Sequence, residues 1–393
     1  MLHINQLTQV LAALLTLLMQ VNKIAIDLAN NYNNRNRIAR CMPGIIVNDS
    51  VIIEDAAEGS QIYNKGFYGY PRSGGGLELD LLEACYLVET GRLVVYEGSL
   101  VIGFSEIMRR AACVCDDFEI DYLVYRDLRQ RGYIVKRGTS DFDFRVFPRG
   151  GTPTSSPTKF WVSAMTERSL FDIEKFLQDV ERSEKTRKEL LVAVVDEEGD
   201  ITYYKASSVI PKGRFSSVRK EIESIEAFLF EDRVLVFEER AVQQLYDQEF
   251  YGKKIGNALQ LSMIETAFLL EDNKIVLRSA KSGRKIGLNG LRKRAKKIQT
   301  DFDLRFKVYS DLRRKGLIVK TGFKYGSHFR VYDADPDKHH SKYLVHAVPT
   351  EYCVTWPEIS RAVRLAHGVK KEILFGRISD CKVDYLKLKR VRP

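Results

Sequence analysis

The sequence predicts an α+β protein in tandem duplication, in which each repeat is a small α+β domain followed by an α/β domain with a mixed sheet. Three observations support this prediction. Segments of the first half recur in the same order in the second half. Within each copy, apolar residues at helical spacing alternate with short β-branched runs. The length of 393 residues exceeds what one hydrophobic core usually holds.

Four pairs of matching segments define the repeat. They are residues 61–69 with 244–252, 77–95 with 259–277, 124–138 with 308–322, and 143–147 with 328–332. Matches that keep one order along the chain indicate a duplicated unit. The predicted parts are an extension at 1–41, a small domain at 42–105, an α/β domain at 106–212, a second small domain at 213–288 and a second α/β domain at 289–393.

The extension contains an uncharged stretch from Ile4 to Asn22 that includes several Asn and Gln residues and follows no Lys or Arg. This composition argues against a membrane span and against a signal peptide. We expect residues 1–41 to be non-native or disordered, added by an upstream start codon. The six cysteines form no CxxC pair, which argues against a zinc ribbon and is typical of a reduced, cytoplasmic protein.

Each small domain is predicted to contain a helix, at 81–87 or 263–269, followed by a β-branched strand. Each α/β domain opens with a helix that ends at Gly132 or Gly316, because glycine readily takes the left-handed conformation after a helix. In the second copy, one more helix and five strands follow. The helix lies within 356–372, and the strands are 317–320, 329–332, 342–348, 373–379 and 382–389. Interleaved strands and helices favour a mixed sheet.

The net charge of +10 is concentrated in one segment. From Lys281 to Lys320 there are fourteen Lys or Arg residues and three Asp. Cations at this density fit a phosphate-rich partner such as a nucleic acid. The alternative interpretation is a solvated helix and turn.

The two copies differ at ionisable positions. Tyr332 aligns with Phe147, and His340 aligns with Pro157. Lys371 falls opposite another lysine, Lys188. Five of the six histidines lie after residue 327, and histidine suits proton transfer near neutral pH. His339 is the rival to His340. These differences place the chemistry in the second copy.

A phenol, an imidazole and an ammonium without clustered carboxylates fit metal-independent cleavage of RNA, with no cofactor. The 2′-hydroxyl is the nucleophile, and a base and an acid each contribute about 10²–10⁴-fold. A fixed cation stabilises the charge that develops on phosphorus. The products carry a 2′,3′-cyclic phosphate and a 5′-hydroxyl, so DNA cannot react in this way.

Segments 308–332, 340–349 and 361–374 resemble the catalytic domain of archaeal tRNA-intron endonucleases. Segments 61–69 and 81–87 with their counterparts resemble the N-terminal domain of that family, and the resemblance extends over residues 42–393. It implies the type in which a structural and a catalytic unit are fused and two chains form a homodimer. The implied substrate is precursor tRNA, cleaved at bulge–helix–bulge junctions, and no membrane partner is implied.

The resemblance also implies roles for individual residues. Tyr332 would be the general base, His340 the general acid and Lys371 the cation of the transition state. The pKa of tyrosine is ordinarily about 10, and we expect Lys371 to lower it. His328 departs from the family, which usually has a small or acidic residue at that position.

Two arginines of the family hold a flipped bulge base between them. Arg364 matches the first. Arg390 is expected to be the second, with Lys389 and Arg392 as rivals. Stacking on a guanidinium plane accepts any base. Surface arginines without such a role are the alternative for both.

An acidic loop of the first copy is implied to dock into a basic pocket across the dimer. It consists of Asp196, Glu197, Glu198 and Asp200. The alternative is an acidic turn in solvent. Strands near Tyr203 and Tyr385 are expected at sheet edges, where they would add contacts between the two chains.

Two other functions remain open at this point. A non-catalytic RNA-binding or structural subunit would suit the basic segment and the degenerate first copy. A metal-dependent nuclease would need two or three carboxylates at a strand pair, and the second copy shows no such set.

Overall fold

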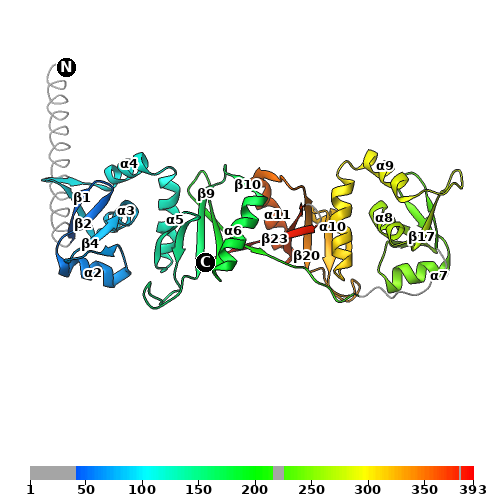
Figure 1. Ribbon diagram of the computed structural model, residues 1–393, viewed down its shortest axis with the longest axis horizontal. Coiled ribbons are helices and arrows are strands. Elements are labelled where there is room, and N and C mark those ends of the chain that lie inside the picture. Colours follow the sequence, from blue (N-terminus) through cyan, green and yellow to red (C-terminus); the bar gives the residue numbers. More distant parts are fainter. Residues whose placement is uncertain (1–40, 216–224, 380–381) are drawn as a thin grey trace, which may run out of the picture. The chain divides into compact units, whose positions relative to one another are not determined.

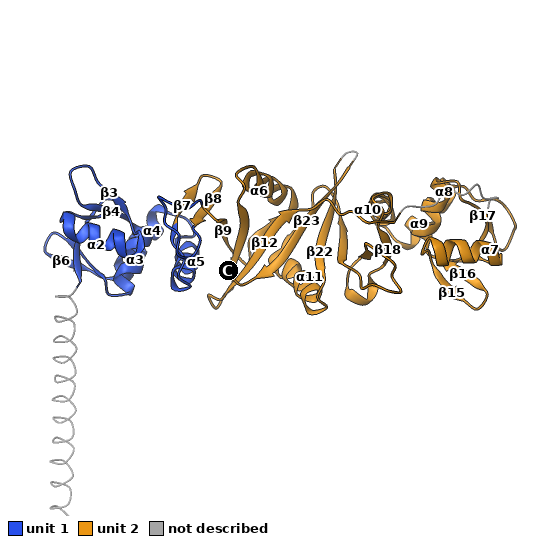
Figure 2. Cartoon of the chain, turned by 90° about the horizontal axis from the view of Figure 1, so that it is seen from below, with its two compact units in different colours: residues 1–135, 147–157 blue, residues 136–146, 158–393 orange. Residues whose placement is uncertain are grey.

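The computed structural model describes residues 41–215, 225–379 and 382–393 (Figure 1). The extension expected at residues 1–41 therefore lies, apart from Cys41, outside the described residues. The chain forms two compact units (Figure 2). Unit 1 consists of residues 1–135 and 147–157, and unit 2 consists of residues 136–146 and 158–393.

Unit 1 contains the first small domain, built on a six-stranded sheet. The strand order is β3 (Tyr70–Pro71), β4 (Leu77–Asp80), β2 (Ser50–Ile53), β1 (Met42–Val47), β5 (Leu93–Glu97) and β6 (Leu100–Ile102). Its helices are α2 (Ala56–Gly66), α3 (Leu81–Glu89) and α4 (Phe104–Val114), and α5 (Phe118–Gln130) follows. Asp80 caps α3 by accepting a hydrogen bond from the amide of Glu83, which satisfies a backbone donor of the first turn.

The second small domain repeats this plan within unit 2. The strand order is β15 (Lys253–Ile255), β16 (Ala258–Leu261), β14 (Val234–Val236), β13 (Ile225–Leu229) and β17 (Ile275–Ser279). The helices are α7 (Glu239–Val242), the π-helix Gln243–Gln248, α8 (Met263–Glu271) and α9 (Leu288–Ile298). A capping box of Ser262 and Glu265 starts α8. The predicted helices at 81–87 and 263–269 are thus confirmed.

Unit 2 also holds one ten-stranded mixed sheet to which both α/β domains contribute. The second copy supplies β18 (Ile318–Thr321), β19 (Phe329–Tyr332), β20 (Tyr343–Val348), β22 (Glu372–Ser379) and β23 (Lys382–Val391). From the centre outwards, the first copy supplies β12 (Ile201–Ser208), β11 (Glu189–Val195), β9 (Phe160–Thr166), β8 (Phe142–Val146) and β7 (Val135–Thr139). The two strand orders mirror each other, as a duplicated unit requires.

The strand pairing at the centre of this sheet contradicts the expectation that the strands near Tyr203 and Tyr385 lie at sheet edges. Tyr203 and Tyr385 lie on β12 and β23, which pair with each other in antiparallel fashion within the chain. Tyr203 lies opposite Val391, and Ser208 lies opposite Leu386. These strands are therefore interior strands and offer no free edge to a second chain. The sequence pattern marked them as strands but did not show that each would find its partner in the other repeat.

Helices cover the sheet and bury one core between the two copies. They are α6 (Ile173–Lys185) and α11 (Trp356–Gly368), and the short strands β10 (Leu170–Asp172) and β21 (Cys353–Thr355) pair beside them. The ring of Trp356 in the second copy stacks on Tyr204 of the first, with ring centroids 5.3 Å apart. Phe171 meets the same indole edge-on at 5.5 Å. Such aromatic contacts add to the burial of apolar area, so residues of both copies share one core within unit 2.

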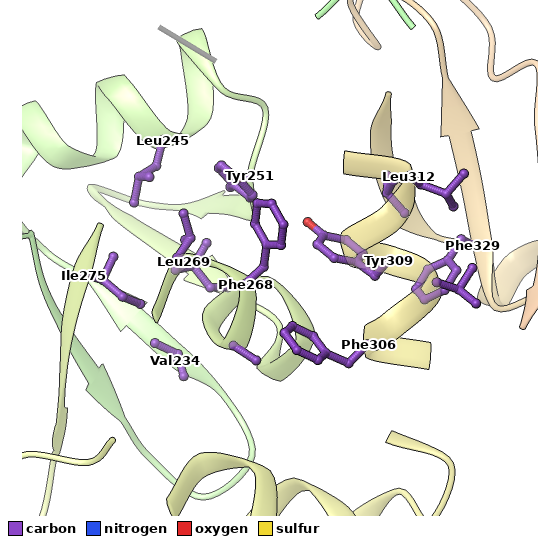
Figure 3. Close-up of a cluster of buried hydrophobic side chains, with 14 of the residues drawn as sticks. Val234, Leu245, Tyr251, Phe268, Leu269, Ile275, Phe306, Tyr309, Leu312 and Phe329 are labelled. Atoms are coloured by element: carbon purple, nitrogen blue, oxygen red, sulfur yellow. The ribbon is translucent and has the colours of Figure 1, made fainter. Parts of the chain in front are cut away.

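A second core joins the second small domain to its α/β domain. Helix α10 (Phe302–Arg314) packs between the domain of α8 and the strands β18 and β20. Phe306 and Tyr309 of α10 face Phe268 of α8, while Leu312 and Phe329 lie on the side of the sheet (Figure 3). One continuous apolar cluster therefore fixes the small domain on the α/β domain of its own copy.

Candidate active site

Tyr332 is the last residue of β19 and lies opposite Ile318 of β18. Its side chain is buried, and the Ser341 side chain lies near its hydroxyl. Burial raises the pKa of Tyr332, while Arg330 and the Ser341 side chain act in the lowering direction. The expectation that Lys371 lowers this pKa is not supported, because burial outweighs the nearby cations and Arg330 is the cation that acts most strongly.

Lys371 approaches the same serine from a different element. It lies between the end of α11 and the start of β22, and its Nζ donates to the carbonyl oxygen of Ser341 over 3.3 Å. The ammonium also lies 5.7 Å from the centre of the Tyr325 ring. Ser341 therefore connects the phenol of Tyr332, through its side chain, with the ammonium of Lys371, through its carbonyl.

His340 immediately precedes Ser341, three residues before Tyr343 starts β20. Its side chain is exposed, and within the described part of the chain it has no hydrogen-bond partner. The exposed imidazole is therefore accessible to a ligand. The structure thus brings all three predicted residues to the segment around Ser341, from the end of β19, the start of β20 and the start of β22.

Local backbone structure sets the direction of Lys371. Helix α11 ends at Gly368, and Lys370 then takes a left-handed conformation with φ 56°. The amide of Lys371 donates back to the carbonyl of Ala366 over 2.9 Å, which closes the helix end. The amide of Glu372 then reaches the carbonyl of Lys342 over 3.2 Å and begins the parallel pairing of β22 with β20.

The other histidines among the described residues separate into two groups. His328 and His346 lie with ring centroids 5.3 Å apart, and His346 stacks on Phe375. Burial, reinforced by Arg305, lowers the pKa of each to about 4. Both rings are therefore neutral near pH 7 and serve in packing. His339 and His367 are exposed, like His340.

Comparison with known proteins identifies the family of this chain. The tRNA intron endonuclease catalytic C-terminal domain matches residues 118–203 and 302–385, and the N-terminal domain of the same family matches 42–108 and 225–292. The tRNA-splicing endonuclease of Methanococcoides burtonii is 38% identical over 351 residues, which cover 88% of this chain and 99% of the relative. The chain belongs to the tRNA intron endonuclease family.

Further relatives agree with this assignment. The tRNA-splicing endonuclease of Methanosarcina mazei is 37% identical over 85% of this chain and 94% of its own length. That of Halobacterium salinarum is 33% identical over 90% of this chain and 100% of its own. This chain is thus an endoribonuclease of the tRNA intron endonuclease type in which both domains of the family occur twice.

The duplicated endonuclease domains share a backbone but differ in side chains. Arg187 precedes Lys188 in the first copy with the same φ of 56° as Lys370, and the amide of Lys188 donates to Ser183 over 2.9 Å, as Lys371 does to Ala366. Both copies therefore have a lysine at this position with the same local backbone conformation. Phe147 is buried like Tyr332 but lacks the hydroxyl.

The structure explains the presence of a histidine at position 328, where the family usually has a small or acidic residue. Its Nδ1 accepts a hydrogen bond from the amide of Ala347 over 3.0 Å. In the first copy, Asp143 accepts one from the amide of Ala164 over 2.8 Å. The imidazole thus replaces a carboxylate as the acceptor at one fixed backbone position.

Two residues near the site were missed by sequence reasoning. They are Ser341 and Tyr325. Tyr325 lies in the 3-10 helix Phe323–Tyr325 and influences Tyr332 as well as Lys371. A signal for Tyr325 was present, because the corresponding loop of the first copy, at 138–141, has no aromatic residue.

The two candidate base-binding arginines are exposed. Arg364 lies on α11, and Arg390 lies on β23 opposite Tyr204. Within the described residues, neither guanidinium has a hydrogen-bond or ion-pair partner. Both are available to a ligand, and no contact ties them to the segment around Ser341.

The acidic loop forms the turn between β11 and β12, and all four of its carboxylate residues, Asp196, Glu197, Glu198 and Asp200, are exposed. The Asp196 carboxylate accepts hydrogen bonds from the amides of Glu198 and Asp200 at 3.1 and 2.9 Å. Glu197 forms an ion pair with Arg168. The turn is therefore held in shape by its first residue and presents the others to solvent.

Among the described residues, no group of three His, Cys, Asp or Glu side chains is placed to hold a metal ion. In the same part of the chain, every helix is too short or too polar to cross a bilayer.

Proposed function

We propose that this endonuclease cleaves precursor tRNA at bulge–helix–bulge junctions through attack of the substrate's own 2′-hydroxyl. The observation that carries the proposal is the convergence on Ser341, which is contacted by Tyr332 and Lys371 and follows His340 directly. Family membership and the tRNA-splicing endonucleases among its relatives support this substrate.

In the proposed reaction, Tyr332 takes the proton of the 2′-hydroxyl, and the 2′-oxygen forms a bond to phosphorus. The bond from phosphorus to the 5′-oxygen breaks, and His340 gives its proton to that oxygen. Lys371 stabilises the added negative charge on the phosphoryl oxygens. One product ends in a 2′,3′-cyclic phosphate and the other in a 5′-hydroxyl, so protons and charge balance without an added nucleophile.

The Ser341 side chain supports the base in this proposal. A hydroxyl that donates to the phenol oxygen stabilises the phenolate more than the neutral phenol, which is the lowering influence on the Tyr332 pKa. The carbonyl of the same residue holds the Lys371 ammonium in place. Ser341 thus acts as a positioning residue for two of the three groups.

The test is cleavage of an end-labelled, intron-bearing precursor tRNA by the purified protein in excess EDTA. We expect two cuts, each leaving a 2′,3′-cyclic phosphate that resists phosphatase until acid opens the ring. The 5′ ends of the downstream fragments should accept phosphate from a kinase without prior dephosphorylation. Cutting only when Mg²⁺ is restored, or products with 5′-phosphates, would contradict the mechanism. Binding without cutting would favour the RNA-binding subunit instead.

We also propose that two chains form a homodimer in which the acidic loop of one docks on the catalytic domain of the other. The carboxylates of residues 196–200 support this idea, since charged loops orient protein partners. Light scattering should give about twice the chain mass of 45.1 kDa. Exchanging the four loop carboxylates for their amides should yield a monomer. In Asp196→Asn, the side-chain amide oxygen can still accept the hydrogen bonds that shape the turn.

A matched control removes four exposed carboxylates elsewhere, at Glu231, Asp232, Glu238 and Glu239. It changes the net charge equally and should leave the mass unchanged. A wild-type monomer, or equal dissociation of both variants, would contradict docking by the acidic loop.

A further inference from the structure

The second small domain carries a dense cationic surface along α9 and the segment that joins it to β17. Both elements are labelled in Figure 1. Residues 281–298 include eight Lys or Arg residues and no Asp or Glu. The corresponding stretch of the first copy, residues 98–114, has two arginines and one glutamate. The two copies have the same fold here, because α4 and α9 are both 11 residues long and each starts after a glycine cap. The difference in charge therefore does not follow from the fold.

A hollow of about 390 Å³ lies within this surface. Four cations line it, together with Ser279, Gly290 and two other residues. The cations are Arg284, Lys293, Arg294 and Lys297. All four side chains are exposed, and in the described part of the chain none has an ion-pair partner. Like charges gathered around one hollow repel each other unless an anion enters it.

The first copy shows how such cations are otherwise neutralised. Arg109 and Arg110 occupy the positions of Lys293 and Arg294 in the matching helix. Arg109 pairs with Glu106 at 2.6 Å. Arg110 pairs with Glu106 at 3.1 Å and with Glu97 at 2.8 Å. The second copy has Gly290 in place of Glu106 and Ser279 in place of Glu97.

The loss of carboxylates is confined to the hollow. On the other side of α9, Arg292 pairs with Asp303 at 2.9 Å, and Lys296 pairs with the same carboxylate. Arg292 and Lys296 do not line the hollow. Among the described residues, therefore, the α9 cations that lack a carboxylate partner are the ones that line the hollow. At this hollow, small residues replace the acidic residues of the first copy.

The hollow is held rigidly on the catalytic half of its own copy. Leu291 and Ala295 of α9 are buried in the continuous core that includes Phe306 and Tyr309 of α10. An RNA bound at the hollow would therefore have a fixed position relative to the endonuclease domain of the same copy.

We propose that this hollow binds the sugar–phosphate backbone of the substrate RNA, outside the junction that is cut. The inference rests on the proposed function for the identity of the RNA. Lysine and arginine side chains without aromatic neighbours suit phosphates and do not read bases. Among the described residues that line the hollow, Ile286 has the one large apolar side chain. The site contributes affinity that is independent of sequence and sensitive to salt.

The test restores the two carboxylates of the first copy with the double variant Ser279→Glu/Gly290→Glu. A Cβ atom at Gly290 would lie 3.3 Å from Cγ2 of Ile286, and its backbone is helical rather than left-handed. Replacing a helical glycine with a residue of higher helix propensity also favours the helix. Ser279→Gln/Gly290→Gln is the matched control, with side chains of the same size and no charge.

We expect the Glu variant to bind full-length precursor tRNA at least about 10-fold more weakly at low salt, with a flatter dependence of affinity on salt. Each lost phosphate contact reduces the slope by about 0.9. The single-turnover rate at saturating RNA should not change. The Gln variant should match the wild type. A minimal RNA that contains only the junction should bind all three proteins alike.

Equal affinity of the Glu variant and the wild type for full-length RNA would overturn the inference, as would equal weakening by the Gln variant. Weakened binding of the minimal junction RNA would place the surface at the cleavage site and would overturn it too. These results differ from a failure of the proposed function, in which the wild-type protein itself does not cut precursor tRNA.

Discussion

Replacing His340 with alanine is expected to slow cleavage about 10²–10⁴-fold at saturating RNA, with little change in RNA affinity. The imidazole is exposed and has no hydrogen-bond partner among the described residues, so its removal leaves the fold intact. A general acid contributes within this range because the 5′-oxygen is a poor leaving group without a proton. Single-turnover kinetics on precursor tRNA measure the chemical step directly.

His339→Ala is the matched control, since the neighbouring imidazole is equally exposed and lies one residue further from Ser341. It should keep nearly the full rate. A substrate with sulfur in place of the 5′-bridging oxygen should restore most of the lost rate to His340→Ala, because a thiolate leaves without protonation. If His339→Ala has the larger effect, or if the sulfur substrate restores nothing, His340 is not the acid.

Much of the fold was predictable from the sequence because duplication supplies an internal comparison. Helices such as 263–269 and the strand that ends at Tyr332 were predicted from their periodicity and recur in both copies. The candidate groups at 332 and 340 stood out because the first copy has Phe147 and Pro157 there. Such contrasts are visible in the amino-acid sequence alone.

Other features depend on three-dimensional contacts that a sequence does not display. Ser341 matters through its carbonyl oxygen as well as its side chain, and any residue type has a carbonyl. The direction of the Tyr332 pKa follows from its burial, which outweighs the cations around it. The pairing of β12 with β23 depends on which strands of the two repeats meet, and periodicity does not specify partners.

Tyr332→Phe is the second change for which we expect a large effect, again about 10²–10⁴-fold in the single-turnover rate. Phe147 shows that the ring without a hydroxyl fits this position in the same fold. The variant should keep nearly the full stability, because the buried ring is retained. A thermal melt separates this small effect from the loss of activity.

The pH dependence distinguishes a base from a merely structural phenol. Burial raises the pKa of Tyr332 above its usual value of about 10, so the neutral phenol dominates at about pH 7–9 and each pH unit increases the phenolate about tenfold. The His340→Ala background lacks the proposed acid. The residual rate should then rise by about the same factor per unit, after subtraction of uncatalysed RNA hydrolysis. The double variant His340→Ala/Tyr332→Phe should show no such rise, and a slope that persists without the hydroxyl would assign the base to another group.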